Sequence, residues 1–253
     1  MQETSELYKR IIASPNHRFE TKVETEEHAS LFGEDDVPIY VITERLLHHV
    51  RREKPGMDGY QPTAGNVFAA SLDMEIEGTI NDWIFNPMEE FDVYVRAIGT
   101  ADGVQQTSEW IPQGVYFLDT REYSEAGTVQ ITAYDAMLKT EKPYPDTNHA
   151  WPYKDIDVLR EIAQDIEVTL DPRTVEIVTA GLMIELPADY TEREVLGMIA
   201  SAYVGNFVIT DANKLLLVPI YGTDDDNLSG NYLADDDGTT ALMMGDEGWF
   251  ILV

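Results

Sequence analysis

The sequence predicts an α+β protein that is mainly β, and three observations lead to this fold class. Short segments with alternating apolar and polar residues, separated by Gly, Asp and Pro, fill the first 145 residues. Helical spacing of apolar residues appears only after residue 146, apart from one short stretch at the start. Three prolines between positions 142 and 152 separate the two patterns, and we predict a domain boundary there. A chain of 253 residues can form one large domain or two smaller ones.

The first predicted element is a short helix. Thr4 or Ser5 can cap its start, and Leu7 and Ile11 recur at helical spacing. Pro15 ends it, because the residue before a proline is disfavoured in helical conformation.

Strands are predicted next, and they should form a closed or nearly closed barrel or a sandwich. The clearest alternation lies in residues 71–78, where apolar residues face one side and carboxylates the other. Turn residues 125–127 predict a hairpin between the last two strands. The predicted strands span residues 18–24, 38–43, 67–77, 91–98, 110–123 and 128–134.

Two helices and a hairpin predict a small α+β unit at residues 146–222. The first helix should begin with Asp155 as its N-cap. The second has a capping box formed by Thr191 and Glu194, with Gly205 at its C-terminal cap. Two apolar segments then flank a polar turn, and their ranges are 206–210 and 215–220.

The segment 223–253 differs from both parts before it. It holds eight acidic residues and no Lys or Arg, yet it ends on the apolar run WFILV. An exposed apolar run is an aggregation hazard. We therefore expect this segment to begin a third domain, or to be a strand that pairs with something.

The charge balance excludes several function classes. The chain carries 47 acidic and 17 basic residues, for a formal net charge of −30. Such a chain repels phosphate backbones and anionic lipids, which argues against nonspecific nucleic-acid binding and polybasic membrane docking. It has no apolar run long enough for a transmembrane helix and no signal-peptide pattern at its start, so we expect a protein outside the membrane. The absence of cysteine excludes disulfides and thiol chemistry.

No catalytic residue, metal site or cofactor is predicted. The nucleophile elbow, zinc-protease, Walker and dinucleotide motifs are all absent. The histidine pair His48 and His49 lies among arginines, which disfavour a bound metal, so we interpret both as surface residues. Leu233 and Met244 occupy ligand positions of the one EF-hand-like alignment and exclude it. A looser calcium site among the neighbouring aspartates stays an alternative to a solvated acidic loop.

Two groups of sequence blocks carry a family resemblance. The first group is SEWIPQGVYFLDTRE at residues 108–122 and VQITAYDAMLKTEKPY at residues 129–144. The second is WPYKDIDVLREIAQ at 151–164, LDPRTV at 170–175 and YTEREVLGMIASAYVGNFVITDANKLLLVPI at 190–220. In order and spacing, these blocks resemble the tail structural proteins of long-tailed bacteriophages and prophages, in the hub or tail-associated group at the distal end of the tail tube.

The resemblance implies a domain order and an assembly. Residues 1–145 would be a tail-tube-like β-barrel domain, 146–222 an α+β insertion domain, and 223–253 the start of a second tube-like domain. The protein would form a homotrimer in the virion tail tip, made in the host cytoplasm. Its partners would be the tail tube or distal tail protein, the receptor-binding proteins of the tip and the tape measure protein, and DNA would pass through without specific binding.

The resemblance also suggests roles for individual side chains. Trp110 and Phe117 would be barrel-core or domain-contact residues. Asp119 and Arg121 would form a cross-strand polar pair, or an ordinary exposed ion pair.

An acidic wall would suit a tube that passes DNA, because lysine-lined walls would attract the duplex. Asp73, Glu75 and Glu77 are the candidate wall, although any solvated antiparallel strand alternates in the same way. Two other function classes stay open: the amino-terminal part of a peptidoglycan-active tail enzyme, and an acidic soluble binding module of the kind found in salt-rich cytoplasm.

Overall fold

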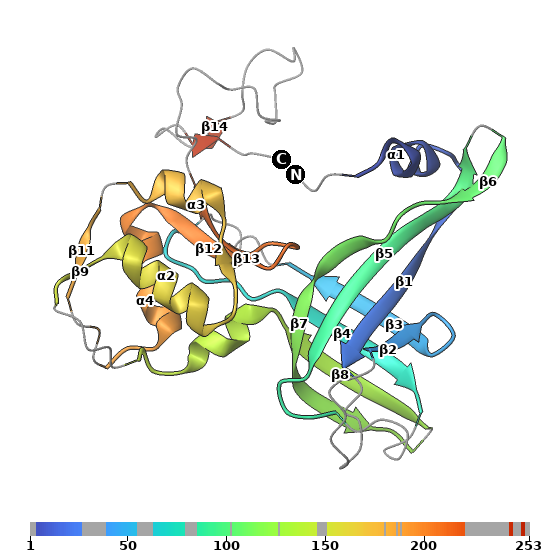
Figure 1. The fold of residues 1–253 in the computed structure, drawn as a ribbon, viewed down its shortest axis with the longest axis horizontal. Coiled ribbons are helices and arrows are strands. Elements are labelled where there is room, and N and C mark those ends of the chain that lie inside the picture. Colours follow the sequence, from blue (N-terminus) through green and yellow to red (C-terminus); the bar gives the residue numbers. More distant parts are fainter. Residues whose placement is uncertain are drawn as a thin grey trace.

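The computed structural model describes most of the chain up to Ile220. The described residues are 4–26, 39–54, 63–78, 85–101, 103–125, 127–145, 151–179, 181–185, 187, 189–220, 243–244 and 249–250. Figure 1 shows two bodies side by side, a long-stranded sheet and a helical unit, which we define as residues 136–220.

Helix α1 (Glu6–Ile12) confirms the first predicted element. The side chain of Ser5 accepts a hydrogen bond from the backbone N–H of Tyr8 and caps the helix. The helix packs on the far end of the sheet through a small cluster that includes the fully buried Ile11. Ser5 also donates from its backbone N–H and its hydroxyl to the carboxylate of Glu109, at 2.8 and 2.6 Å, which holds α1 in place.

One large antiparallel sheet dominates the fold, as the predicted fold class requires. Its strand order is β2-β1-β5-β7-β8-β4-β3, and β6 pairs with the end of β5. The strands are β1 (His17–Glu26), β2 (Ile39–Thr43), β3 (Leu47–Glu53), β4 (Ser71–Glu77), β5 (Glu90–Ala101), β6 (Val104–Thr107), β7 (Ile111–Tyr123) and β8 (Thr128–Tyr134).

The sheet curls so that its two ends meet at one corner. β2 and β3 stand at opposite ends of the strand order, yet only residues 44–46 separate them in the sequence. Three residues span roughly 10 Å at most, so the sheet has to bend back on itself. One core cluster accordingly takes Ile42 from β2 together with side chains of β1, β4, β5, β7 and β8, and Val50 of β3 packs against it. β2 and β3 do not pair with each other, so backbone pairing does not close the described sheet into a barrel.

The structure adds two strands to the large sheet that the sequence analysis does not predict. β3 contains the histidine pair that the sequence analysis interprets as plain surface residues, and β6 follows the turn after β5. The β7–β8 hairpin matches the predicted one. The predicted strand at residues 67–77 is shorter, because only residues 71–77 belong to β4.

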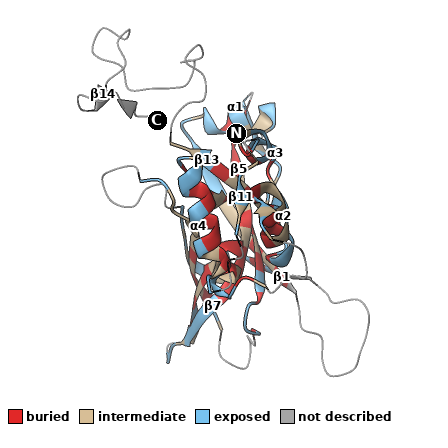
Figure 2. Cartoon of the chain, turned by 90° about the vertical axis from the view of Figure 1, so that its left-hand side faces the viewer, coloured by how far each residue is buried: buried red, intermediate tan, exposed pale blue. Residues whose placement is uncertain are grey.

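The helical unit packs its helices on a small sheet, and Figure 2 shows buried residues along the helices α2 and α4. The small sheet has the order β10-β13-β12, with β10 parallel to β13. The elements of the helical unit are η1 (Ala136–Glu141), β9 (Tyr153–Lys154), α2 (Asp155–Asp165), β10 (Thr169–Leu170), α3 (Pro172–Ile177), β11 (Met183–Ile184), α4 (Glu192–Ala202), β12 (Gly205–Ile209) and β13 (Lys214–Pro219).

Two helix ends differ from the sequence interpretation. Lys154 is the N-cap of α2, whereas Asp155 is its first residue and is fully buried. Asp155 accepts hydrogen bonds from the N–H of Leu182 and the hydroxyl of Tyr203, so tertiary partners replace the capping role. At the end of α4, Val204 takes the left-handed conformation and Gly205 already begins β12. The capping box of Thr191 and Glu194 is confirmed.

The prediction of a third domain at residues 223–253 falls almost entirely outside the described residues. Within it the structure describes two short paired strands, β14 (Met243–Met244) and β15 (Trp249–Phe250). The predicted boundaries at 145 and 222 stay predictions.

Candidate functional site

The three predicted wall residues lie together on the outer face of β4. Their apolar neighbours along the strand, Leu72 and Ile76 among them, are fully buried in the sheet core. Asp73 and Glu75 are half-buried and Glu77 is exposed, on the opposite face. The predicted alternation is therefore confirmed. A role of this face as a channel wall stays a prediction.

Residues of β3 face these carboxylates and change the charge of the surface. The strand register places Arg51 opposite Asp73 and His49 opposite Glu75. The third carboxylate of the row lies 3.8 Å from Nε2 of His48. The outer face of β3 and β4 is consequently a mixed-charge surface.

Trp110, the residue before β7, lies on the outer face of the sheet, over β1 and β5. The guanidinium carbon of Arg96 is 4.3 Å from the centroid of its ring, and Nζ of Lys22 is 5.0 Å away. The same ammonium lies 4.5 Å from the ring of Tyr94, and Arg96 is held by Glu20 at 2.7 Å. These contacts tie β1, β5 and the start of β7 together, each contributing on the order of 0.5–1 kcal/mol.

Phe117, Asp119 and Arg121 have different roles although all three lie on β7. Phe117 is buried in the core of the helical unit, with Nζ of Lys139 3.8 Å from its ring centroid. Asp119 is exposed, at an irregularity in the pairing with β8. Arg121 donates to the backbone carbonyl of Phe85. The expectation that Asp119 and Arg121 form a cross-strand pair is wrong, because both residues belong to one strand.

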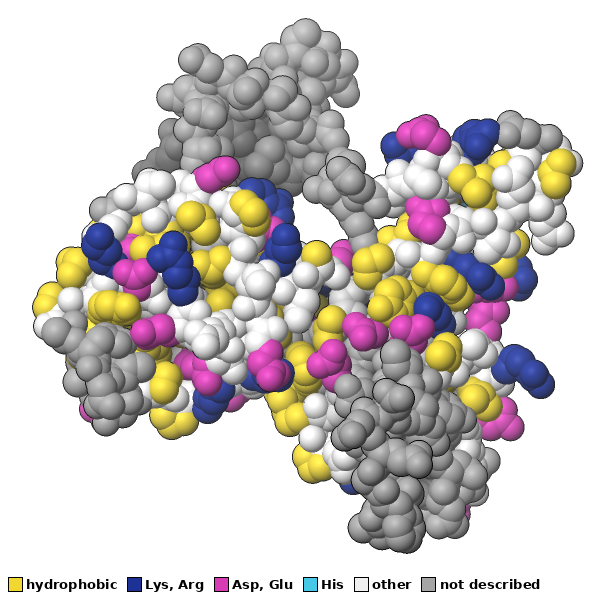
Figure 3. Space-filling view, in the orientation of Figure 1, with side chains coloured by type: hydrophobic (Ala, Val, Ile, Leu, Met, Phe, Trp, Pro, Cys, Tyr) yellow, Lys and Arg dark blue, Asp and Glu magenta, His cyan; other side chains and the backbone are white. Residues whose placement is uncertain are grey.

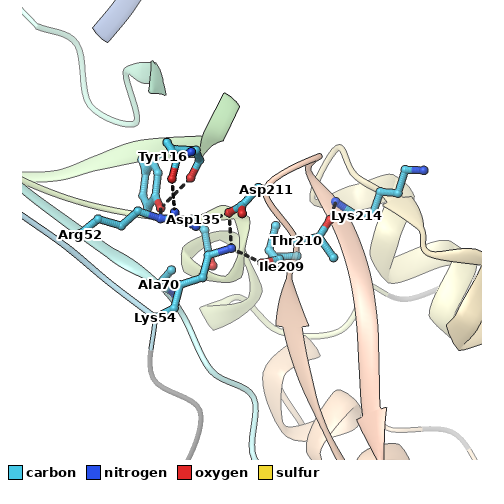
Figure 4. A network of polar contacts seen from close by, with 10 residues as sticks. Arg52, Lys54, Ala70, Tyr116, Asp135, Ile209, Thr210, Asp211 and Lys214 are labelled. Atoms are coloured by element: carbon cyan, nitrogen blue, oxygen red, sulfur yellow. Dashed lines mark hydrogen bonds and ion pairs between the residues drawn. The ribbon is translucent and has the colours of Figure 1, made fainter. Parts of the chain in front are cut away.

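Polar side chains of both bodies meet at Asp211, in the turn between β12 and β13 (Figure 4). Asp211 forms ion pairs with Arg52 at the end of β3 and with Lys54 just after it. Arg52 also donates from Nε to the hydroxyl of Tyr116, at 2.6 Å, and from Nη1 to Gln113, at 2.8 Å. The side chains of Arg52 and Asp211 are only 21% and 28% exposed, so this junction is shielded from bulk water.

The phenol of Tyr116 completes this network as a neutral group. Burial raises the pKa of Tyr116 to about 12. Its hydroxyl accepts from Arg52 and donates to the carbonyl of Gln113, at 3.2 Å. The network therefore fixes side chains in place and offers no activated nucleophile.

Asp135 fastens the start of the helical unit to the segment before β4. It is the N-cap of η1 and accepts from the backbone N–H of Met137, at 3.0 Å. Its other oxygen accepts from the N–H of Ala70, at 2.9 Å. Burial raises the pKa of Asp135 to about 6, since only 4% of the residue is exposed.

A backbone seam joins the segment before β4 to β12 of the helical unit. The N–H of Phe207 donates to the carbonyl of Asn66, and the N–H of Phe68 donates to the carbonyl of Phe207, both at 2.9 Å. The N–H of Gly65 donates to the carbonyl of Gly205, at 2.8 Å. The segment thus adds an isolated parallel β-bridge, between Val67 and Phe207, to the edge of the small sheet.

Close approach to α4 explains the glycine in this seam. Gly65 has a φ of +90°, and a Cβ there would lie 2.1 Å from Oγ of Ser201. Arg193 of α4 donates to the carbonyls of Val67 and Met137, at 2.7 and 3.1 Å. Backbone and side-chain contacts therefore lock one body onto the other.

Neither the backbone seam nor the junction at Asp211 can be found in the sequence. Arg52 and Asp211 are 159 positions apart, and Arg52 stands in a basic stretch that the sequence alone presents as surface. A faint local signal is Gly65 next to the polar Asn66, which is typical of any turn.

The described residues show no metal centre and no membrane-spanning helix. Within them, no three His, Asp or Glu side chains group in a way that could hold a metal ion. No described helix is both long and apolar enough to cross a membrane. Figure 3 shows acidic and basic side chains interspersed over one face of both bodies.

Comparison with known proteins finds distant similarity in structures alone. No protein-family model and no curated protein matches the sequence. The 43 kDa tail protein of prophage MuSo2 from Shewanella oneidensis aligns with a TM-score of 0.44 and 11% identity, over 83% of this chain and 58% of that one. A chain of the lidded PdpA-VgrG complex of Francisella aligns with a TM-score of 0.44 and 10% identity, over 88% and 31%. At TM-scores below 0.5, neither likeness supports a conclusion about fold or function.

Proposed function

We propose that this protein is a structural component of a phage-type tail, in the hub that joins the tail tube to the distal tip. The resemblance of the sequence blocks between residues 108 and 220 motivates the proposal. The observation that carries it is the curled antiparallel sheet followed by a helical unit docked on that sheet, because this is the domain order that the resemblance implies.

The role we assign to the protein is mechanical. The two bodies are joined by backbone hydrogen bonds, by the ion pairs of Asp211 and by the buried Asp135, so the junction is built to transmit force. The junction at Asp211 is a network of hydrogen-bonded and ion-paired side chains. We propose no enzymatic activity for this chain.

Assembly would complete the ring that the curled sheet leaves open. In this proposal three copies form a homotrimer with the barrel-like sheets around a central channel, and the outer face of β4 lines it. The arrangement places the carboxylates of β4 toward passing DNA, together with Arg51 of β3, which is paired with Glu53. The remaining negative charge lowers the affinity of DNA for the wall. Neighbours along the axis would be the tail tube or distal tail protein on one side and tip proteins on the other.

Electron cryo-microscopy of tail particles that contain the natural full-length protein tests the proposal. We expect three copies about the tail axis, with Asp73 and Glu77 facing the lumen. A single copy remote from the axis would contradict the hub assignment. A ring with β4 turned outward would contradict the wall alone.

Reversing the charges of β4 tests its role as a channel wall separately from its role in folding. The triple variant Asp73→Lys, Glu75→Lys and Glu77→Lys should assemble into particles but slow DNA release, and added salt should restore the rate because it screens the attraction. Reversal of Glu176, Glu185 and Asp189, which are exposed on the helical unit, is the matched control. Equal rates in the two variants would refute the wall.

A further inference from the structure

A buried carboxyl group without a hydrogen-bond donor lies inside the helical unit, next to the segment that follows η1. Glu192, the first residue of α4, is fully buried, and neither of its carboxyl oxygens has a donor among the described residues. An ionised carboxylate in such a position is very costly unless it is paired and hydrogen-bonded. The geometry therefore favours the neutral acid at this position.

The neighbour of Glu192 is a second carboxyl group. Asp165, the last residue of α2, meets Glu192 at Lys142, whose backbone carbonyl accepts from the N–H of Glu192 at 3.1 Å, and a hydrogen bond with Asp165 is part of what raises the pKa of Glu192. Asp165 in turn forms an ion pair with Lys142. Two carboxylates can share a hydrogen bond only when one of them carries a proton, and the pairing with Lys142 keeps Asp165 ionised.

We propose that Glu192 stays protonated at neutral pH and donates a hydrogen bond to the carboxylate of Asp165. This carboxyl pair then works as a proton-dependent latch that holds together α2, α4 and the chain segment that enters them. The segment is the one that follows η1. The N–H of Glu192 donates to the carbonyl of Lys142, at 3.1 Å, and the N–H of Tyr144 donates to the carbonyl of Tyr190, at 2.8 Å.

The charges around the latch are otherwise compensated. Burial, followed by the contact with Asp165, raises the pKa of Glu192 to about 8, and Lys142 acts in the opposite direction. Tyr144 donates its hydroxyl to Glu161 at 2.6 Å, Lys139 pairs with Glu167, Arg193 pairs with Glu141, and Glu194 accepts from Thr191. Apart from Lys142, which is held by Asp165, these pairings leave no described cation for an ionised Glu192.

Loss of the proton should open this connection. Above the pKa of Glu192, two adjacent carboxylates would repel each other, and one would be buried without a donor. This repulsion is relieved only if the end of α2 separates from the start of α4, or if the segment after η1 detaches. The latch is consequently closed at neutral and acidic pH and weakened in alkaline solution.

Stability against pH tests the latch in the full chain. The native state holds its proton above the ordinary pKa of a glutamic acid, so the stability of the unmodified protein should fall as pH rises from about 5 through about 8. In Glu192→Gln, a neutral group of the same shape, the fall across this window should be reduced. Glu176→Gln, at an exposed position of α3, should reproduce the unmodified profile. Equal pH profiles for the Glu192 variant and the unmodified protein would overturn the proposal.

A direct titration keeps the test decisive if the variant does not fold. Carbon-13 spectra of the side-chain carboxyl groups should show one glutamate in the unmodified protein that titrates near or above pH 7. Titration of every resolved glutamate below pH 5.5 would overturn the latch. Hydrogen exchange at the amides of Tyr144 and Glu192, corrected for the intrinsic pH effect, should rise above pH 8 in the unmodified protein, and unchanged protection would count against the opening.

Discussion

Two seams hold the helical unit to the sheet, and they depend on different physics. The backbone seam joins Gly65 and Phe68 to β12 through hydrogen bonds that carry no charge. The ionic seam joins Arg52 and Lys54 to Asp211 at the other side of the junction. The backbone seam is intolerant of added atoms and indifferent to salt, whereas the ionic seam tolerates changes of shape and weakens as salt screens it. Each can therefore be broken without touching the other.

The backbone seam should give the largest loss of stability. Gly65→Ala forces an L residue into φ +90° and places its Cβ against Ser201. We expect the free energy of unfolding to fall by about 3 kcal/mol, from the conformational cost and the overpacking together. Denaturant titration measures the change. Gly103→Ala is the control, because Gly103 has a φ of +78° and a Cβ added there would meet no atom within 4 Å. Similar losses in both variants would mean that the close approach to α4 contributes little.

The ionic seam should give the next largest effect. Asp211→Asn leaves Arg52 and Lys54 facing an uncharged side chain in a partly shielded place, and we expect a loss of about 2 kcal/mol. The exposed pair of Glu6 and Lys9 is the control, and Glu6→Gln should change the free energy of unfolding far less than Asp211→Asn. Denaturant titration at low and at high salt measures the free energy of unfolding of both variants. The difference between them should shrink as the salt concentration rises. A constant gap would assign the loss to packing.

The carboxylate of Asp135 should respond to pH at the same junction. Its pKa is about 6 in the folded protein and near 3.8 in the unfolded chain, so the folded state binds the proton more tightly. The contribution of Asp135 to stability is complete below pH 4 and falls by about 2 kcal/mol as pH rises to 6.5. Asp135→Asn should lack this part of the pH dependence in thermal or denaturant unfolding. An unchanged difference between pH 4 and pH 6.5 would contradict the assignment.

The outer face of β4 should matter least to stability. Asp73→Asn, Glu75→Gln and Glu77→Gln remove charges from the outer face of the sheet, where none of the three is fully buried, and each should change the free energy of unfolding by no more than about 0.5 kcal/mol. Thermal unfolding of the combined variant measures this. A loss above about 3 kcal/mol would show that the pairing with β3 is a structural element of the sheet and would remove the main reason to regard this face as free for assembly.

Local patterns predict the elements whose partners are near in sequence. The serine cap of α1, the capping box at Thr191 and the two-residue alternation of β4 depend on neighbours within a few positions, and all three are present. β3 escapes prediction because its inward residue next to the junction is Arg52, a charged side chain whose partners come from β7 and from the turn after β12. The cap assigned to Asp155 is wrong for the same reason, since its partners Leu182 and Tyr203 belong to later elements. Residues with distant polar partners look like surface in a single sequence.

The curled sheet can change its diameter at one place, the corner at which three residues join β2 to β3. Every other neighbouring pair along the strand order is held by a ladder of backbone bonds, so widening there would break several bonds at once. Among the described residues, β2 and β3 share a corner but no ladder, and they are held there by side-chain contacts around Ile42 and Val50. A curled sheet with one unpaired edge can widen or narrow to match the surface on which it docks. The short connection at residues 44–46 limits how far β2 and β3 can move apart.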